Sequence, residues 1–326
     1  MFLCDRTSIE ILPGNLEDWQ SIEMLPGSRR PSPEFPFVLV DGNLGIPKKV
    51  MARLYLAAVS MPWRNTRTAI AATCVILILN PAHQTALNSR KRLIQTGHLG
   101  SPVKELRFME LLLRGLIDCA KQSIIWEHRR WCLKLIHGTL GSSVHQHPPL
   151  EHWASAEEAR LLPKLDLEDI RRELAIVYHT CETYPRNYHA WNHWHWLIDI
   201  TLSSIYCHQD EHQQQGFLQL LVDAYVELRK WTDCHPSDYT AMHQLSQCQR
   251  ILDHLHTTKV FTQDVPSSSL VEHCLSLLTA FPTHESLWVH LRVVLGNSKE
   301  EVRLKIVQEV RTNFSWNIYA AKIIGV

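Results

Sequence analysis

The chain has 326 residues, of which 45% are hydrophobic and 20% charged, a composition that supports a buried core and excludes a disordered chain. Lysine plus arginine and aspartate plus glutamate each number 33, so the formal net charge is zero. Broad electrostatic binding to nucleic acid or to an anionic membrane is therefore not expected. The nine cysteines include no close pair, no signal peptide is evident, and no unbroken apolar run has membrane-spanning length. We expect a cytoplasmic protein with reduced thiols and no transmembrane segment.

Proline, glycine and serine are frequent in residues 1–46, as in "MLPGSRRPSPEFPF", and predict a loop-rich N-terminal segment. A helix is predicted next, started by Pro47 and stopped by Pro62. Beyond it, segments with apolar residues at spacings of three and four alternate with breaker-rich gaps, most clearly at 103–120 and 167–184. No convincing strand alternation appears, so the predicted fold class is all-α.

Five segments within the predicted repeat domain, residues 47–326, align around a large apolar anchor near the start of a helix. The anchors are Leu87, Trp126, Trp191, Met242 and Trp288. A final stretch, "NFSWNIYAAKII", resembles a degraded sixth copy. Each unit is predicted to be a helical hairpin covered on both sides by its neighbours. About five to six such hairpins would stack into a right-handed superhelical solenoid, and residues 47–326 would form one domain.

Three of these segments, "LNPAHQTALNSRKRL", "WEHRRWCL" and "NYHAWNH", resemble the repeat of the protein prenyltransferase α-subunit family. The resemblance covers roughly residues 37–295. The order of the copies is most similar to that of an α-subunit-repeat-containing paralogue of the enzyme α subunits. It implies a tetratricopeptide-like crescent of hairpins that wraps around a separate β subunit. That partner would carry the catalytic zinc and most of the isoprenoid pocket, so this chain would bind no cofactor itself.

The resemblance also implies roles for four residues. Lys121, five residues before Trp126, matches a family lysine that reaches the diphosphate of the isoprenoid substrate. Tyr188 matches a tyrosine that faces the same diphosphate, and Asn187 and His189 would bind substrate beside it. The assignment is physically reasonable, because a departing diphosphate gains charge and a preorganised cation and hydroxyl donor stabilise that change.

Two departures from the family pattern bear on this assignment. The copy around Lys121 reads "AKQS" and lacks the usual proline and Asn-Tyr pair. The arginine expected three residues after the anchor is present as Arg90 and Arg129, but three later copies replace it with Trp194, Leu245 and Leu291. We therefore predict a weaker polar network in the C-terminal half.

The stretch "YPRNYHAWNHWHWL" (184–197) also allows a metal or stacking site. His189, His193 and His195 are close in sequence, but a helix cannot aim positions 193 and 195 at one metal, and no HExxH or paired CxxC is present. Packing histidines, and no metal site, are therefore predicted. Base stacking by Trp194 and Trp196 would lack a basic track. A catalytic Cys–His pair stays open, although cysteines on apolar helix faces are more often core thiols.

Two functions from different classes follow. The first is the α-type subunit of a heterodimeric protein prenyltransferase, which transfers a geranylgeranyl or farnesyl group to a protein cysteine beside a zinc-bearing β subunit, most similar to the geranylgeranyltransferase type. The alternative is a non-catalytic helical-repeat scaffold that binds other proteins, for example in the Rab trafficking pathway. A tetratricopeptide-like peptide binder fits less well, because the repeat spacings exceed that family's period of about 34 residues. The lipid, the protein substrate and the β subunit stay open.

Overall fold

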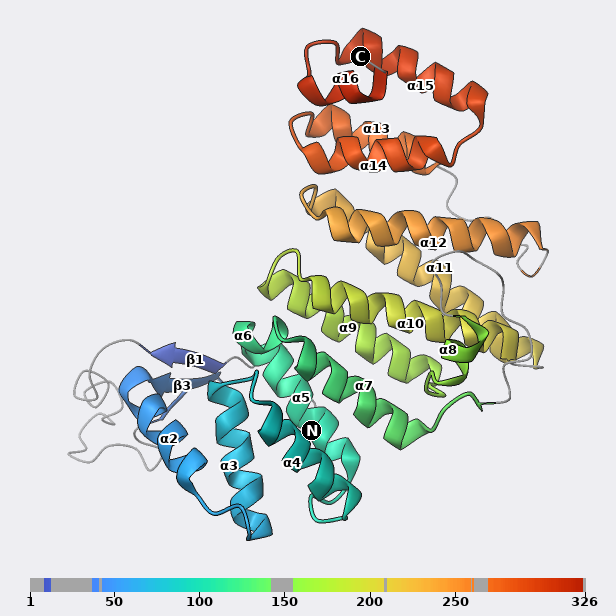
Figure 1. Cartoon of the computed structure of the whole chain (residues 1–326). Helices are drawn as coiled ribbons and strands as arrows, with labels where there is room; N and C mark the ends of the chain where they lie inside the picture. Colours follow the sequence, from blue (N-terminus) through green and yellow to red (C-terminus); the bar gives the residue numbers. More distant parts are fainter. Residues whose placement is uncertain are drawn as a thin grey trace. The chain divides into compact units, whose positions relative to one another are not determined.

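Helices dominate the structure, a computed structural model that describes residues 9–12, 37–40, 43–141, 155–207, 210–258, 260 and 269–324 (Figure 1). The helices of the described residues are α2 (Lys48–Ser60), α3 (Thr66–Leu79), α4 (Gln84–Gln95), α5 (Pro102–Gly115), α6 (Ile117–Ala120), α7 (Ser123–His137), α8 (Ala156–Arg160), α9 (Leu167–Thr183), α10 (Tyr188–Cys207), α11 (Glu211–Cys234), α12 (Tyr239–Thr257), α13 (Leu270–Ala280), α14 (Glu285–Gly296), α15 (Glu300–Asn313) and α16 (Ile318–Ile324). The predicted all-α helical-repeat class is confirmed. The handedness of the superhelix stays a prediction.

Several helices begin at a side chain that caps them. Asn65 accepts hydrogen bonds from the backbone N–H groups of residues 67 and 68 at the start of α3. Ser101 caps α5 just before a proline at its first position, and Ser269 with Glu272 forms a reciprocal capping box on α13. Helix α2 runs between Pro47 and Met61, which agrees with the helix predicted there. These caps mark where α3, α5 and α13 start.

A small sheet that the sequence did not predict precedes α2. Its strands are β1 (Ile9–Leu12), β2 (Val38–Val40) and β3 (Asn43–Pro47), in the order β1-β3-β2. β1 pairs parallel to β3, and β2 pairs antiparallel to it. The other residues of the predicted loop-rich segment lie outside the described residues.

The chain divides into two compact units. The first comprises residues 1–139, 163–165 and 172–193, and the second comprises residues 140–162, 166–171 and 194–326. That residues 47–326 form a single repeat domain stays a prediction.

Within the first unit, α2 packs on α3, α3 on α4, and α5 on α7. Within the second unit, α11 packs on α12, α13 on α14, and α15 on α16, as Figure 1 shows. Apart from the α2–α3 pair, these pairs are the helical hairpins expected from the repeat. The degraded sixth copy, residues 313–324, covers the end of α15, the following turn and α16, and its Trp316 is 64% exposed, so Trp316 is not a buried anchor.

The five anchor residues are all buried. Two of the indoles repeat one hydrogen bond: Trp126 Nε1 donates to the carbonyl of Ala120 at 3.0 Å, and Trp288 Nε1 donates to the carbonyl of Pro282 at 2.8 Å. Both acceptors lie six residues before the anchor. The anchor therefore fills the hairpin with apolar area and also fixes the turn that leads into its helix.

Candidate functional site

Two neighbouring turns of the first unit bring the predicted site residues together. Lys121 lies in the turn before α7, and Tyr188 is the first residue of α10. The carbonyl of Ala120 accepts a hydrogen bond from Trp126 within its own hairpin and a second from Asn187 Nδ2 at 3.1 Å. Because Ala120 precedes Lys121 and Asn187 precedes Tyr188, this shared carbonyl ties the two turns to each other.

The ammonium group of Lys121 is accessible. Its Nζ lies 4.6 Å from the centre of the Tyr184 ring and 3.5 Å from a carboxylate oxygen of Asp118. The Lys121 side chain is 38% exposed and that of Asp118 is 76% exposed, so the ion pair between them is weak. The ring face holds the cation at the surface, and a solvated ammonium keeps donors for an anion.

Tyr188 is exposed, with 66% of its surface open to solvent. Its ring meets the His189 ring edge-on at 5.6 Å. His189 is half-buried, and burial, helped by the charge of Arg130, lowers its pKa. A neutral imidazole is therefore favoured beside the tyrosine.

Arg186 is a candidate that the sequence analysis missed. It stands five residues before Trp191, the same offset that separates Lys121 from Trp126, and it is exposed. Its φ of 59° places a non-glycine residue in the left-handed region, a conformation that needs support from its surroundings. The equal offset from the anchor was the signal that would have found it.

Asn187, predicted to bind substrate, is buried and engaged with the backbone. Its Oδ1 accepts from the N–H groups of His189 and Ala190, both at 3.1 Å, and its Nδ2 donates to Ala120. It thus caps α10 and ties two hairpins, which is a structural use of this side chain. Its substrate-binding role stays a prediction without structural support.

The same capping position recurs in the second unit. Asp238 Oδ1 accepts from the N–H of Ala241 at 3.1 Å at the start of α12. Asn317 Oδ1 accepts from the N–H of Tyr319 at 2.8 Å, and its Nδ2 donates to the carbonyl of Pro282 in the preceding hairpin. The position is therefore a feature of the repeat.

Two buried triads link successive hairpins of the first unit. In the first, Arg90 makes two hydrogen bonds to Glu105, at 2.8 and 2.6 Å, and His128 Nε2 lies 2.8 Å from the same carboxylate. Each triad takes its arginine from the second helix of one hairpin and its glutamate and histidine from the next hairpin. The triads therefore hold register between repeats.

The second triad repeats this geometry one hairpin further on. Arg129 donates to Glu173 at 2.7 and 2.6 Å, and His193 Nε2 lies 3.0 Å from that carboxylate. Burial alone would raise the pKa of Glu173, but the charge of Arg129 and the hydrogen bond from His193 lower it to about 2. Burial lowers the pKa of His193 to about 4. The carboxylate is thus charged and the imidazole neutral at pH 7.

In the second unit, apolar residues occupy the position of the triad arginine. The residues at the arginine position there are buried Trp194, Leu245 and Leu291. His195 Nδ1 lies 3.1 Å from Gln244 Oε1, and Ser246 Oγ lies 3.3 Å from His290 Nδ1. The arginine-centred network predicted to weaken in the C-terminal half lacks its arginine at these three positions.

The histidines of the "NYHAWNHWHW" stretch have protein partners in place of a metal. His193 contacts Glu173 and also accepts from Arg130 Nε at 3.2 Å, while His195 contacts Gln244. No cluster of three or more potential metal ligands occurs among the described residues. In that same part of the chain, no helix is long and apolar enough to cross a membrane.

The buried cysteines are poor nucleophiles. Burial raises the pKa of the Cys119 and Cys132 thiols to about 12 and also raises the pKa values of Cys248 and Cys274. A thiol with so high a pKa is almost entirely protonated at neutral pH. These four residues therefore behave as core side chains.

Residues 170–201, which include the second triad's glutamate and histidine together with Asn187 and Tyr188, match the family model of the "Protein prenyltransferase alpha subunit repeat". The chain contains a protein prenyltransferase alpha subunit repeat. The resemblance seen in the sequence is thereby confirmed for residues 170–201, which carry Asn187, Tyr188 and His189 but not Lys121.

Known proteins with this repeat are similar over most of the chain. "Protein prenyltransferase alpha subunit repeat-containing protein 1-B" of Xenopus laevis is 27% identical over 297 residues, which cover 79% of this chain and 64% of that protein. The corresponding protein 1 of Danio rerio is 26% identical over 292 residues, covering 79% and 63%. That of Homo sapiens is 27% identical over 299 residues, covering 79% and 68%. The chain thus spans a little under two thirds of the first two relatives.

Proposed function

We propose that this chain is the α-type subunit of a heterodimeric protein prenyltransferase and works in the cytoplasm beside a zinc-bearing β subunit of the geranylgeranyltransferase type. One observation carries the proposal: Tyr188 is exposed and the Lys121 side chain is 38% exposed on two turns that share the Ala120 carbonyl, whereas the anchors Trp126 and Trp191 and also Asn187 are buried. Exposed polar groups on a rigid frame are free to serve a ligand that a partner binds.

This chain would contribute to only one part of the transfer reaction, the departure of the diphosphate. A protein thiolate attacks the carbon that bears the diphosphate, the carbon–oxygen bond breaks, and the diphosphate leaves with added charge. The zinc of the partner would lower the pKa of the attacking thiol and hold its thiolate. The Lys121 ammonium and the Tyr188 hydroxyl would donate to the leaving oxygens, and Arg186 presents a second cation on the same turn as Tyr188.

The test is co-expression with a geranylgeranyltransferase β subunit, followed by size-exclusion chromatography with light scattering and a geranylgeranyl-transfer assay on CaaX-type and double-cysteine proteins. A 1:1 complex with activity is expected. Lys121→Ala should lower kcat by about 10- to 100-fold while the complex stays intact, because a donor to developing charge is lost.

Lys91 supplies a matched control. Its Nζ lies 5.4 Å from the centre of the Trp131 ring, so it is also a lysine over an aromatic face in the first unit, but it lies within α4 and outside the two turns. Lys91→Ala should leave kcat unchanged. Equal losses for the two variants would contradict the diphosphate role of Lys121.

A non-catalytic scaffold that binds other proteins is the second candidate, and exposed apolar residues in the second unit favour it. Tyr239, Trp316 and Ile318 are more than half exposed and lie at the starts of α12 and α16. Neighbouring turns there are joined by a hydrogen bond between Ser237 Oγ and His284 Nδ1 at 2.9 Å. Apolar side chains gathered at hairpin turns suit protein contacts. A complex that forms but transfers no isoprenoid to any substrate would favour this candidate.

A further inference from the structure

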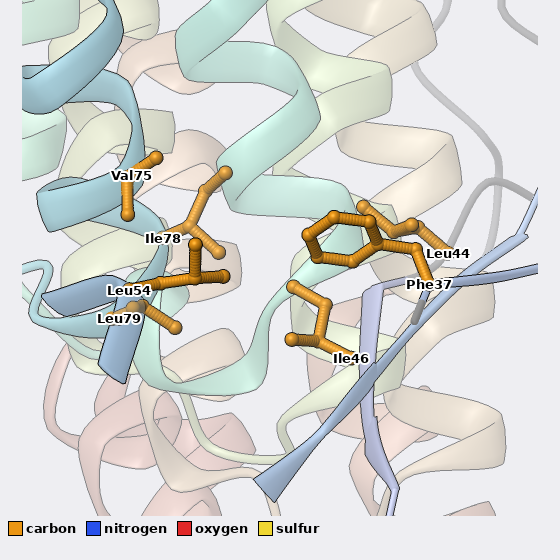
Figure 2. A pocket seen from close by; sticks show the side chains of 7 residues that line it. All are labelled: Phe37, Leu44, Ile46, Leu54, Val75, Ile78 and Leu79. Carbon is orange, nitrogen blue, oxygen red and sulfur yellow. The ribbon is translucent and has the colours of Figure 1, made fainter. Parts of the chain in front are cut away.

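An apolar pocket of about 370 Å³ lies between the N-terminal sheet and the helices α2 and α3 (Figure 2). Figure 2 shows side chains from the strand side facing side chains from the two helices across the pocket. The residues that line it are Phe37, Leu44, Ile46, Leu54, Val75, Ile78 and Leu79. Only Ile46 among them is fully buried, so the pocket opens to solvent.

The lining is hydrocarbon throughout. None of the seven side chains carries a hydrogen-bond donor or acceptor. A peptide segment placed here would leave backbone N–H and C=O groups without partners, which costs free energy for every group. The occupant must therefore lack polar atoms over the part that enters.

The volume of the pocket limits the size of the occupant. An apolar cavity of about 150 Å³ lined by leucine, isoleucine and phenylalanine admits benzene, which has six carbons. A pocket about two and a half times larger has room for roughly fifteen carbons by the same measure, and its volume lies in the range of small-molecule sites.

Two polar residues directly follow lining residues along the chain. Tyr55 follows Leu54, Asn80 follows Leu79, and Asn80 Nδ2 donates to the Tyr55 hydroxyl at 3.4 Å. Both side chains are half-buried, and neither lines the pocket.

We propose that this pocket binds a hydrocarbon chain of about fifteen carbons. The chain is either an isoprenoid or a straight acyl or alkyl chain. The proposal uses neither Lys121 nor Tyr188, so it stands or fails separately from the proposed function.

The experiment measures displacement of 11-dansylamino-undecanoic acid from the full chain by two probes of fifteen carbons, farnesol and pentadecan-1-ol. Saturable displacement is expected. Displacement by farnesol alone identifies an isoprenoid site, by pentadecanol alone a straight-chain site, and by both a general hydrocarbon site. Absence of saturable binding by either probe overturns the proposal.

Substitutions of residues that line the pocket test whether the probes bind there. Val75→Phe adds about four carbons to the lining, and each methylene excluded from burial weakens binding about fourfold, so affinity should fall at least about tenfold. Leu54→Gln places an amide in the pocket and should also weaken binding. It replaces Val75→Phe in the test if that variant does not fold. Val59→Phe, on the exposed side of α2, is the matched control and should bind as the parent does.

Two further results would overturn the proposal. The first is undiminished binding in both pocket variants with melting temperatures like that of the parent. The second is a dimer in light scattering that Val75→Phe dissociates, because the pocket would then be a contact between two copies of this chain.

Discussion

The Arg129–Glu173 pair offers the sharpest test of how the repeats are held together. Arg129 is 1% exposed and donates to both oxygens of Glu173, and its third nitrogen donates to the carbonyl of Leu106 at 2.8 Å. Arg129→Ala removes all three bonds and leaves a buried carboxylate with only His193 beside it. Breaking a buried pair in this way costs about 3–5 kcal/mol of unfolding free energy.

The control is the exposed pair between Lys230 and Glu227, which has a similar distance of 2.7 Å but side chains that are 66% and 57% exposed. Lys230→Ala should cost less than about 1 kcal/mol, because solvent screens the pair. Arg129→Met combined with Glu173→Leu should recover most of the loss, since apolar residues of similar volume replace buried pairs at little cost.

The assay is urea unfolding, combined with hydrogen exchange of the amides of α7 and α9, which carry the two partners. Exchange reports the local unfolding free energy of these helices even if the two units unfold in separate steps. A loss in Arg129→Ala no larger than in Lys230→Ala would refute the reasoning, as would a double variant less stable than Arg129→Ala alone.

Three further predictions concern pH, capping and the anchor. Burial lowers the pKa of His290 to about 4, against about 6.5 when unfolded, so the unfolded chain binds more protons between these pH values. The contribution of His290 to stability, present above pH 6.5, should therefore fall by roughly 3 kcal/mol as pH drops to 4, and His290→Gln should make the slope of stability against pH shallower in urea titrations; an unchanged slope would contradict it. Asn187→Ala should cost about 1–2 kcal/mol through the lost cap, with kcat of the active complex nearly unchanged; a large drop in kcat at unchanged stability would restore a substrate role. Trp126→Ala should cost about 3–5 kcal/mol in thermal or urea unfolding, and a cost below about 1 kcal/mol would show that the anchor is not packed as described.

The helical repeat was predictable because it depends on patterns among residues that are close in the sequence. Apolar spacing and a large anchor at the same place in each copy need only a few neighbouring residues, and Trp126, Trp191 and Trp288 mark three hairpins unmistakably. The sheet was not predictable in this way. Strands of three to five residues are too short for a clear alternation, and β1 finds its partner β3 only after a long stretch of chain.

The candidate site was predictable only in part, for a related reason. The motif placed Lys121 and Tyr188 on two turns, but it could not show that Asn187 faces a neighbouring carbonyl. Glu105 and Glu173 read as ordinary polar residues of amphipathic helices, because their arginine partners come from a different hairpin. Pairing of that kind is set by packing between repeats and leaves no local pattern.

The most direct test of the central claim is light scattering on the full chain co-purified with a geranylgeranyltransferase β subunit, coupled to transfer of a geranylgeranyl group to a protein cysteine. The account predicts a stable 1:1 complex that transfers the group and slows in Lys121→Ala but not in Lys91→Ala. A chain that stays monomeric beside every β subunit would contradict it.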